Sequence, residues 1–170
     1  MEESEMNEKR IYMVLMELAR DTRLQEMSQY MQHGDTSVYK HCIAVAYESL
    51  ALADRYHIKT DKLKLIRGAL LHDYFLYDWH EHDKSHCLHG FRHPFTAARN
   101  AKRDTSLSQI EEDIIRKHMF PLVPVPPKYK ESIIVCIADK ICSTYETTHR
   151  DLKSPLYQKA DHMIDKVQKK

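Results

Sequence analysis

Apolar side chains recur with a helical period in almost every segment of this 170-residue chain, and this regularity constrains the fold most. In the first segment the apolar positions are Ile11, Val14, Leu15 and Leu18. Residues at this spacing line one face of an α-helix. Only three glycines occur, which disfavours glycine-rich phosphate loops and β folds with many turns. The pattern predicts an all-α fold, a helical bundle of about seven helices.

Helix-initiating residues and prolines set the expected boundaries. Ser108 and Glu111 form a predicted capping box, and His93-Pro94 resembles a helix start because proline suits the first helical position. Residues 74–92 show no clear period and are predicted to be a loop, as is the stretch 120–127 with its four prolines. Helices are expected over approximately residues 5–29, 37–57, 108–119, 128–149 and 154–169, with a third helix starting near residue 60 and a fourth at His93-Pro94.

Charge and hydropathy exclude several classes of protein. The 26 basic and 25 acidic side chains leave a formal charge of +1, which argues against a strongly basic nucleic-acid binder with a binding groove. The longest apolar run, Ile133 to Ala138, is far below the roughly 18 residues of a membrane span. The charged start, Met1 to Arg10, has no apolar signal-peptide region. We therefore expect one cytoplasmic domain over residues 1–170. A homodimer of this domain is compatible with the sequence.

Several ionisable residues fall on apolar helix faces. His41 lies between Val38 and Val45, and Asp139 interrupts the apolar run of the sixth expected helix. Asp73 continues the apolar face of the third expected helix. His118 comes directly after the apolar face of the fifth expected helix. An unpaired buried carboxylate costs several kcal/mol, and no lysine or arginine recurs on these stripes to pair all of them. A divalent metal would satisfy them together, because it accepts neutral imidazole and ionised carboxylate as ligands.

The adjacent pair His72-Asp73 is the strongest local signal. Neighbouring side chains on a helix diverge by about 100°, but at a helix end both can reach one ion from different sides. A carboxylate has two oxygens, so Asp73 could also bridge two metals while His72 holds one.

These residues give the chain a resemblance to the HD superfamily of metal-dependent phosphohydrolases, over about residues 35–148. The matching segments are Val38-Tyr39-Lys40-His41, Gly68-Ala69-Leu70-Leu71-His72-Asp73, His93-Pro94, His118 and Ala138-Asp139-Lys140. Their order resembles the branch with six ligands and a dinuclear centre, which includes diadenosine tetraphosphate hydrolases. The segment His72 to Trp79 also looks like that of small bacterial HD proteins without an assigned substrate.

The resemblance implies a set of metal ligands. His41, His72, Asp73 and Asp139 would hold one ion, and Asp73 would bridge to a second ion held by His93 and His118. A hydroxide bridging the two ions would attack a phosphoester or phosphoanhydride, which makes Asp73 the catalytic residue of the prediction. Two divalent transition metal ions are implied, from among Fe, Mn, Co, Ni and Zn, because such ligands discriminate poorly among these metals.

Substrate recognition is less constrained by sequence. Lys140 and Arg92, each adjacent to an expected ligand, are candidates for holding the phosphate of a small substrate, with a nucleotide favoured. His89 is an alternative to His93 within a histidine-rich stretch, residues 78–93, whose other histidines we expect in a solvated loop. The residues Met119-Phe120-Pro121-Leu122 could form a substrate wall or a plain interhelical loop.

Two other functions stay open at this point. Some HD proteins resemble this chain in all six ligands but use two irons to oxidise organophosphonates. A non-catalytic domain that binds a nucleotide or a metal is the third possibility. Tyr74 and Phe75 replace the residues that follow HD in cyclic-dinucleotide phosphodiesterases, which disfavours that substrate.

Overall fold

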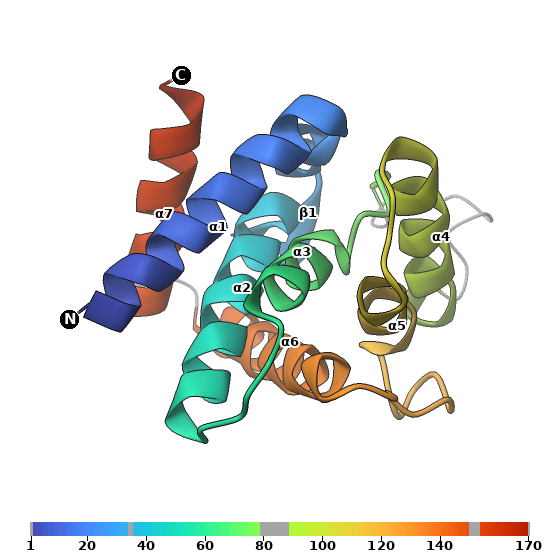
Figure 1. The fold of residues 1–170 in the computed structure, drawn as a ribbon. Coiled ribbons are helices and arrows are strands. Elements are labelled where there is room, and N and C mark those ends of the chain that lie inside the picture. Colours follow the sequence, from blue (N-terminus) through green and yellow to red (C-terminus); the bar gives the residue numbers. More distant parts are fainter. Residues whose placement is uncertain (1, 34–35, 79–88, 150–153, 170) are drawn as a thin grey trace.

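A computed structural model describes residues 2–33, 36–78, 89–149 and 154–169, and within them the chain is almost entirely helical (Figure 1). The predicted all-α class is confirmed, since the described residues form seven α-helices, one 3-10 helix (η1) and a two-stranded antiparallel ribbon. The elements are α1 (Glu2–Asp21), η1 (Leu24–Gln29), β1 (Met31–His33), β2 (Thr36–Ser37), α2 (Val38–Arg55), α3 (Lys62–Leu71), α4 (His89–Asp104), α5 (Gln109–Lys117), α6 (Lys130–Thr148) and α7 (Pro155–Gln168).

Local capping explains where several helices begin. The side chains of Ser37 and Asp61 accept hydrogen bonds from backbone N–H groups in the first turns of α2 and α3. The predicted capping box of α5 is confirmed, since the Ser108 and Glu111 side chains each accept from the other residue's backbone N–H. Pro155 occupies the first turn of α7, where its missing N–H costs no helical bond.

Two predicted boundaries are wrong. The first helix was expected to reach residue 29, but α1 ends at Asp21. Thr22 accounts for the break, because its hydroxyl donates to the Leu18 carbonyl and accepts from the Leu24 N–H, which offers the backbone an alternative to further helical bonds. The chain then continues as η1 and the short β1–β2 ribbon, which sequence periodicity did not predict.

The fourth helix begins one turn earlier than predicted. It starts at His89, so Pro94 lies inside α4 instead of opening it. The earlier turn is held by side-chain contacts: the Tyr77 hydroxyl lies 2.9 Å from His89 Nδ1, and the Phe75 ring packs edge-on against His89. These contacts offset the helical bond that proline cannot make. Most of the predicted loop before this helix, including Trp79, His80, His82 and His86, lies outside the described residues.

Helix α2 is central to the packing (Figure 1). It contacts α3, α6 and α7, while α5 packs against α3, α4 and α6. The terminal helices α1 and α7 lie side by side and both contact α2. One hydrophobic core joins residues from all seven α-helices, so the polar side chains that α2 to α6 direct inward meet in a water-poor interior. No helix within the described ranges is long and apolar enough to span a bilayer.

Gly68 is the point of closest approach between α3 and α5. A Cβ built on this glycine would clash with Ile114 Cδ1 and would lie 3.1 Å from Ile114 Cβ. The missing side chain therefore lets α5 approach α3 closely, and His72 and His118 follow one turn later on these two helices.

Gly68→Ala should lower the free energy of unfolding by about 1–3 kcal/mol, because the added methyl overpacks the contact despite the better helix propensity of alanine. Urea unfolding measures the difference. In an Ile114→Val background, which lacks the Cδ1 methyl, the same substitution should cost less. A Gly68→Ala protein as stable as the unsubstituted chain would contradict this packing.

Candidate metal centre

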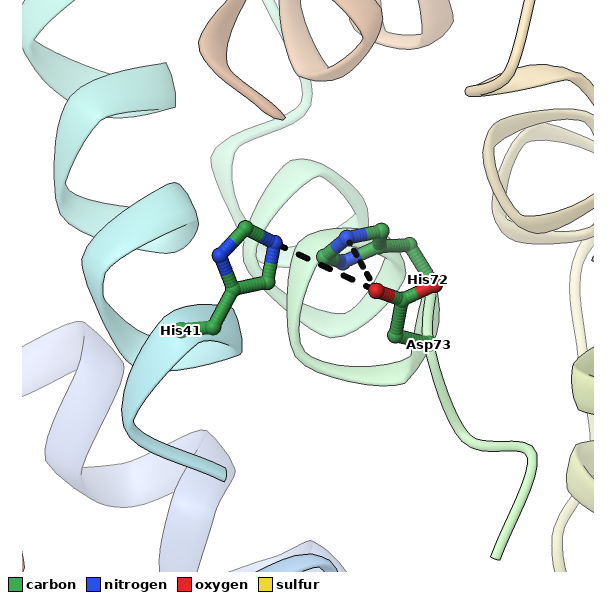
Figure 2. A group of neighbouring side chains, drawn as sticks. All are labelled: His41, His72 and Asp73. Atoms are coloured by element: carbon green, nitrogen blue, oxygen red, sulfur yellow. Dashed lines mark ion pairs between the residues drawn. The ribbon is translucent and has the colours of Figure 1, made fainter. Parts of the chain in front are cut away.

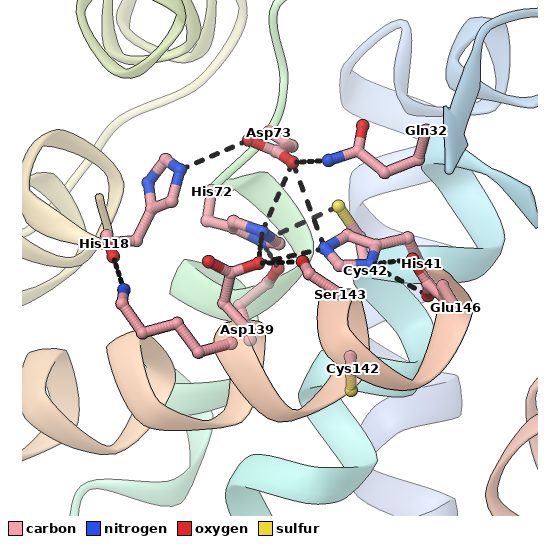
Figure 3. Close-up of polar contacts among 12 residues, drawn as sticks. Gln32, His41, Cys42, His72, Asp73, His118, Asp139, Cys142, Ser143 and Glu146 are labelled. Atoms are coloured by element: carbon pink, nitrogen blue, oxygen red, sulfur yellow. Dashed lines mark hydrogen bonds and ion pairs between the residues drawn. The ribbon is translucent and has the colours of Figure 1, made fainter. Parts of the chain in front are cut away.

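The six ionisable residues singled out in the sequence come from five helical segments and meet in one buried cluster. Figure 3 labels five of them, all except His93. His41 lies in the first turns of α2, and Asp139 lies in the middle of α6. His72 is the C-cap of α3, with Asp73 directly after it. His93 projects from α4, and His118 is the C-cap of α5. All six side chains are buried.

Three of these residues lie close together on one side of Asp73, linked through the two imidazoles, and we call them the first ligand set: His41, His72 and Asp139. The Oδ2 atom of Asp73 lies 3.5 Å from His72 Nε2 and 4.0 Å from His41 Nε2 (Figure 2). Asp139 Oδ1 lies 3.2 Å from His41 Nε2 and 3.6 Å from His72 Nε2. The Nε2 atoms of both imidazoles thus lie near one oxygen of each carboxylate.

The other oxygen of Asp73 faces the second ligand set, His93 and His118. Its Oδ1 atom lies 3.2 Å from His93 Nε2 and 3.3 Å from His118 Nε2. The two imidazole nitrogens are only 2.8 Å apart. Asp73 therefore lies between the two sets, with one oxygen directed to each, as a bridging carboxylate would.

In each of the four imidazoles, the outer nitrogen is Nδ1. A contact of this nitrogen fixes the ring so that Nε2 faces the cluster. His72 Nδ1 donates to the Ala69 carbonyl at 2.7 Å, His93 Nδ1 to the His89 carbonyl at 2.9 Å, and His118 Nδ1 to the Ile115 carbonyl at 2.9 Å. The fourth, His41 Nδ1, contacts the carboxylate of Glu146 at 2.9 Å. In its neutral form with the proton on Nδ1, each ring would direct an Nε2 lone pair into the cluster, which is the usual arrangement of metal-binding histidines.

Unsatisfied atoms in the cluster fit a cation. His72 Nε2 and Asp73 Oδ1 are buried without a hydrogen-bond partner, an arrangement that native interiors usually avoid. The close pair His93 Nε2 and His118 Nε2 would bring two lone pairs together if both rings donate through Nδ1. A positive charge relieves both problems, and groups of these residues could hold metal ions: His41, His72 and Asp73, and Asp73, His93 and His118.

The electrostatics keep both carboxylates ionised. Burial disfavours the charged form of Asp73, but the imidazoles of His72 and His93 hold the pKa of this carboxyl well below its usual range. Burial acts in the same way on Asp139, where His41 and His72 keep the pKa of the carboxyl well below its usual range. Ionised carboxylates are the form that a metal ion requires.

A cavity of about 680 Å³ opens onto the cluster. Asp73, Asp139 and the second ligand set lie on one part of its wall. An apolar part is formed by Met119, Pro121 and Leu122, which the sequence suggested as a substrate wall. A small molecule entering this cavity would reach the carboxylates while its body contacted apolar side chains.

The two candidate phosphate-holding residues are placed differently. Lys140 lines the cavity, but its Nζ donates to the His118 carbonyl at 2.9 Å. Arg92 is exposed on α4 and is not among the described residues that line the cavity. His89, the alternative to His93, lines the cavity one turn away and stacks on the His93 ring, while His93 is the residue that reaches Asp73.

Sequence reasoning missed the residues that support the ligands. Gln32 of β1 donates from Nε2 to Asp73 Oδ2 at 2.6 Å, and Ser143 donates to Asp139 Oδ1 at 3.3 Å. Glu146 and Tyr157 lie behind His41. Glu146 follows Asp139 by seven residues on the same face of α6, which is a signal that could have identified it. Nothing in the sequence marks Gln32, because the short ribbon that carries it was not predicted.

The HD domain family matches residues 38–144 of the chain, which include all six clustered residues. The chain belongs to the HD domain family. Most HD domains are metal-dependent hydrolases, and the buried histidine–aspartate cluster found here is suited to bind a divalent metal. No curated protein and no solved structure gives a significant match to the chain.

Substitutions in the two ligand sets should remove different numbers of metal ions from the HD domain. We expect His118→Ala to leave one ion per chain, because the second ligand set then keeps only His93 beside Asp73. Asp139→Ala should leave the protein metal-poor, because it removes a carboxylate from the first set. Elemental analysis of gently purified protein measures both.

His162→Ala is the matched control, since this histidine is exposed on α7 and should leave the metal content unchanged. If both cluster variants retained two ions per chain, the assignment of these ligands would be wrong.

Proposed function

We propose that this HD domain hydrolyses a phosphoester or phosphoanhydride bond in a small substrate, with a nucleotide as the favoured class. The observation that carries this proposal is the position of Asp73, a buried carboxylate with one oxygen toward each pair of imidazoles. Dinuclear sites of this kind serve displacement at phosphorus, because two cations can contact both the attacking and the leaving oxygens.

The proposed roles follow from the contacts. His41, His72 and Asp139 would hold one ion, His93 and His118 the other, and Asp73 both. When bound, two divalent cations lower the pKa of a coordinated water toward neutral pH and neutralise phosphoryl charge. Gln32 fixes the orientation of Asp73 through its amide.

The cavity supports a substrate with an apolar or aromatic body. Met119, Pro121 and Leu122 form its apolar wall, while Lys140 and Ser143 lie closer to the carboxylates. A nucleotide fits this division, with its base against the apolar wall and its phosphate at the cluster. A nearly neutral protein can bind such an anion because the cations supply the positive charge.

Asp73→Asn should lower phosphate release from a nucleotide panel by about 100-fold or more, because it removes the charge shared by both ligand sets. The assay uses protein loaded with the metal found by elemental analysis. Asp21→Asn, an exposed change on α1, is the control and should keep full activity.

Two results would contradict the proposal. One is phosphate release by Asp73→Asn at the rate of the unsubstituted protein. The other is an iron-loaded protein that consumes dioxygen with an organophosphonate and hydrolyses no member of the panel.

A further inference from the structure

Glu146 is a buried carboxylate that contacts a ligand of the cluster without belonging to either ligand set (Figure 3). Its side chain is fully buried, and its two oxygens lie 2.9 Å and 3.0 Å from His41 Nδ1. The hydroxyl of Tyr157 donates to the same carboxylate at 2.7 Å. A chain of contacts therefore runs from α7 through α6 to the outer nitrogen of His41, whose Nε2 faces the cluster.

His41 is the exception among the four imidazoles. The other three direct Nδ1 to neutral backbone carbonyls: Ala69, His89 and Ile115. Only His41 has a carboxylate as the acceptor within the described part of the chain. A carboxylate makes the inner nitrogen a stronger donor to a metal and fixes the ring orientation more firmly than a carbonyl does.

The two ligand sets thus differ in their negative charge as well as in their number of ligands. The first set has two imidazoles and Asp139 beside the shared Asp73, and Glu146 adds a further carboxylate behind it. The second set has two imidazoles beside the shared carboxylate, with neutral groups behind both rings. A divalent cation is held more strongly where more anionic charge surrounds it at low dielectric constant.

We propose that Glu146, oriented by Tyr157, is a positioning residue that makes the first ligand set bind its cation more tightly than the second. This inference rests on the proposed function, since it requires the cluster to bind metal. Both residues lie beyond residues 38–144, so they are contributed by the part of the chain outside the family match.

The position of Tyr157 suits this role. Its ring is buried and stacks on Tyr145 with centroids 5.4 Å apart, which restricts where the hydroxyl can point. With Glu146 accepting from both Tyr157 and His41, the carboxylate cannot rotate without losing a hydrogen bond. The last helix is thereby coupled to the metal ligand of α2.

The test is a Mn²⁺ titration in a His118→Ala background, where the first ligand set is measured alone. Glu146→Gln should weaken Mn²⁺ binding by about 10–100-fold, the usual effect of removing a partner of a metal-binding histidine. Tyr157→Phe keeps the buried ring and should weaken binding by about twofold to tenfold, the value of one hydrogen bond.

Two matched controls separate positioning from a general loss of structure. Glu131→Gln removes another buried carboxylate of α6, one that accepts from the Asp61 N–H away from the cluster. Tyr145→Phe removes a tyrosine hydroxyl one residue before Glu146. Both should leave the Mn²⁺ affinity of the first ligand set unchanged, even where they lower the melting temperature.

The outcomes distinguish a failure of the proposed function from a failure of this inference alone. If the unsubstituted chain binds neither Mn²⁺ nor any of Fe, Co, Ni and Zn, both the proposed function and this inference are wrong. If the unsubstituted chain binds two ions, but Glu146→Gln and Tyr157→Phe each retain full affinity at the first ligand set, the inference alone is wrong. An equal loss in the control variants would also overturn it. Two-step loading of the unsubstituted chain, with only the tighter step weakened by Glu146→Gln, supports it.

Discussion

The site depends on the burial of two carboxylates, Asp73 and Asp139, in the interior of a helical protein. Removing a carboxylate from water costs several kcal/mol unless opposite charge and hydrogen bonds compensate for it. In this structure the compensation comes from imidazoles on separate helices, each with its outer nitrogen already engaged, and from the amide of Gln32. The cluster is therefore arranged to accept cations, and the helices that carry it must meet for the fold to form.

This constraint connects the fold to the proposed chemistry. Gly68 lets α3 and α5 approach so that His72 and His118 reach the same carboxylate. The supporting contacts come from further away in the chain, since Gln32 precedes the family match and Tyr157 follows it. The HD core thus supplies the six clustered residues, while flanking segments hold them in place and, on our proposal, set the relative strength of the two ligand sets.

Much of this arrangement could be predicted from sequence because it is local. Helical periodicity and capping residues gave the all-α class and the start of α5. Polar residues on apolar faces gave four of the clustered side chains, the adjacent pair His72-Asp73 gave His72, and only the family resemblance gave His93. What could not be predicted depends on contacts between distant segments. The end of α1 depends on Thr22, the early start of α4 depends on Tyr77 and Phe75, and the role of Gln32 depends on a ribbon too short to show a period.

The most direct test of the central claim is a crystal structure of the metal-loaded protein with anomalous data collected at the absorption edge of that metal. We expect two anomalous peaks per chain, one beside each oxygen of Asp73, with His41, His72 and Asp139 around one peak and His93 and His118 around the other. A structure in which Asp73 touches no metal, or in which metal binds only elsewhere, would contradict the account.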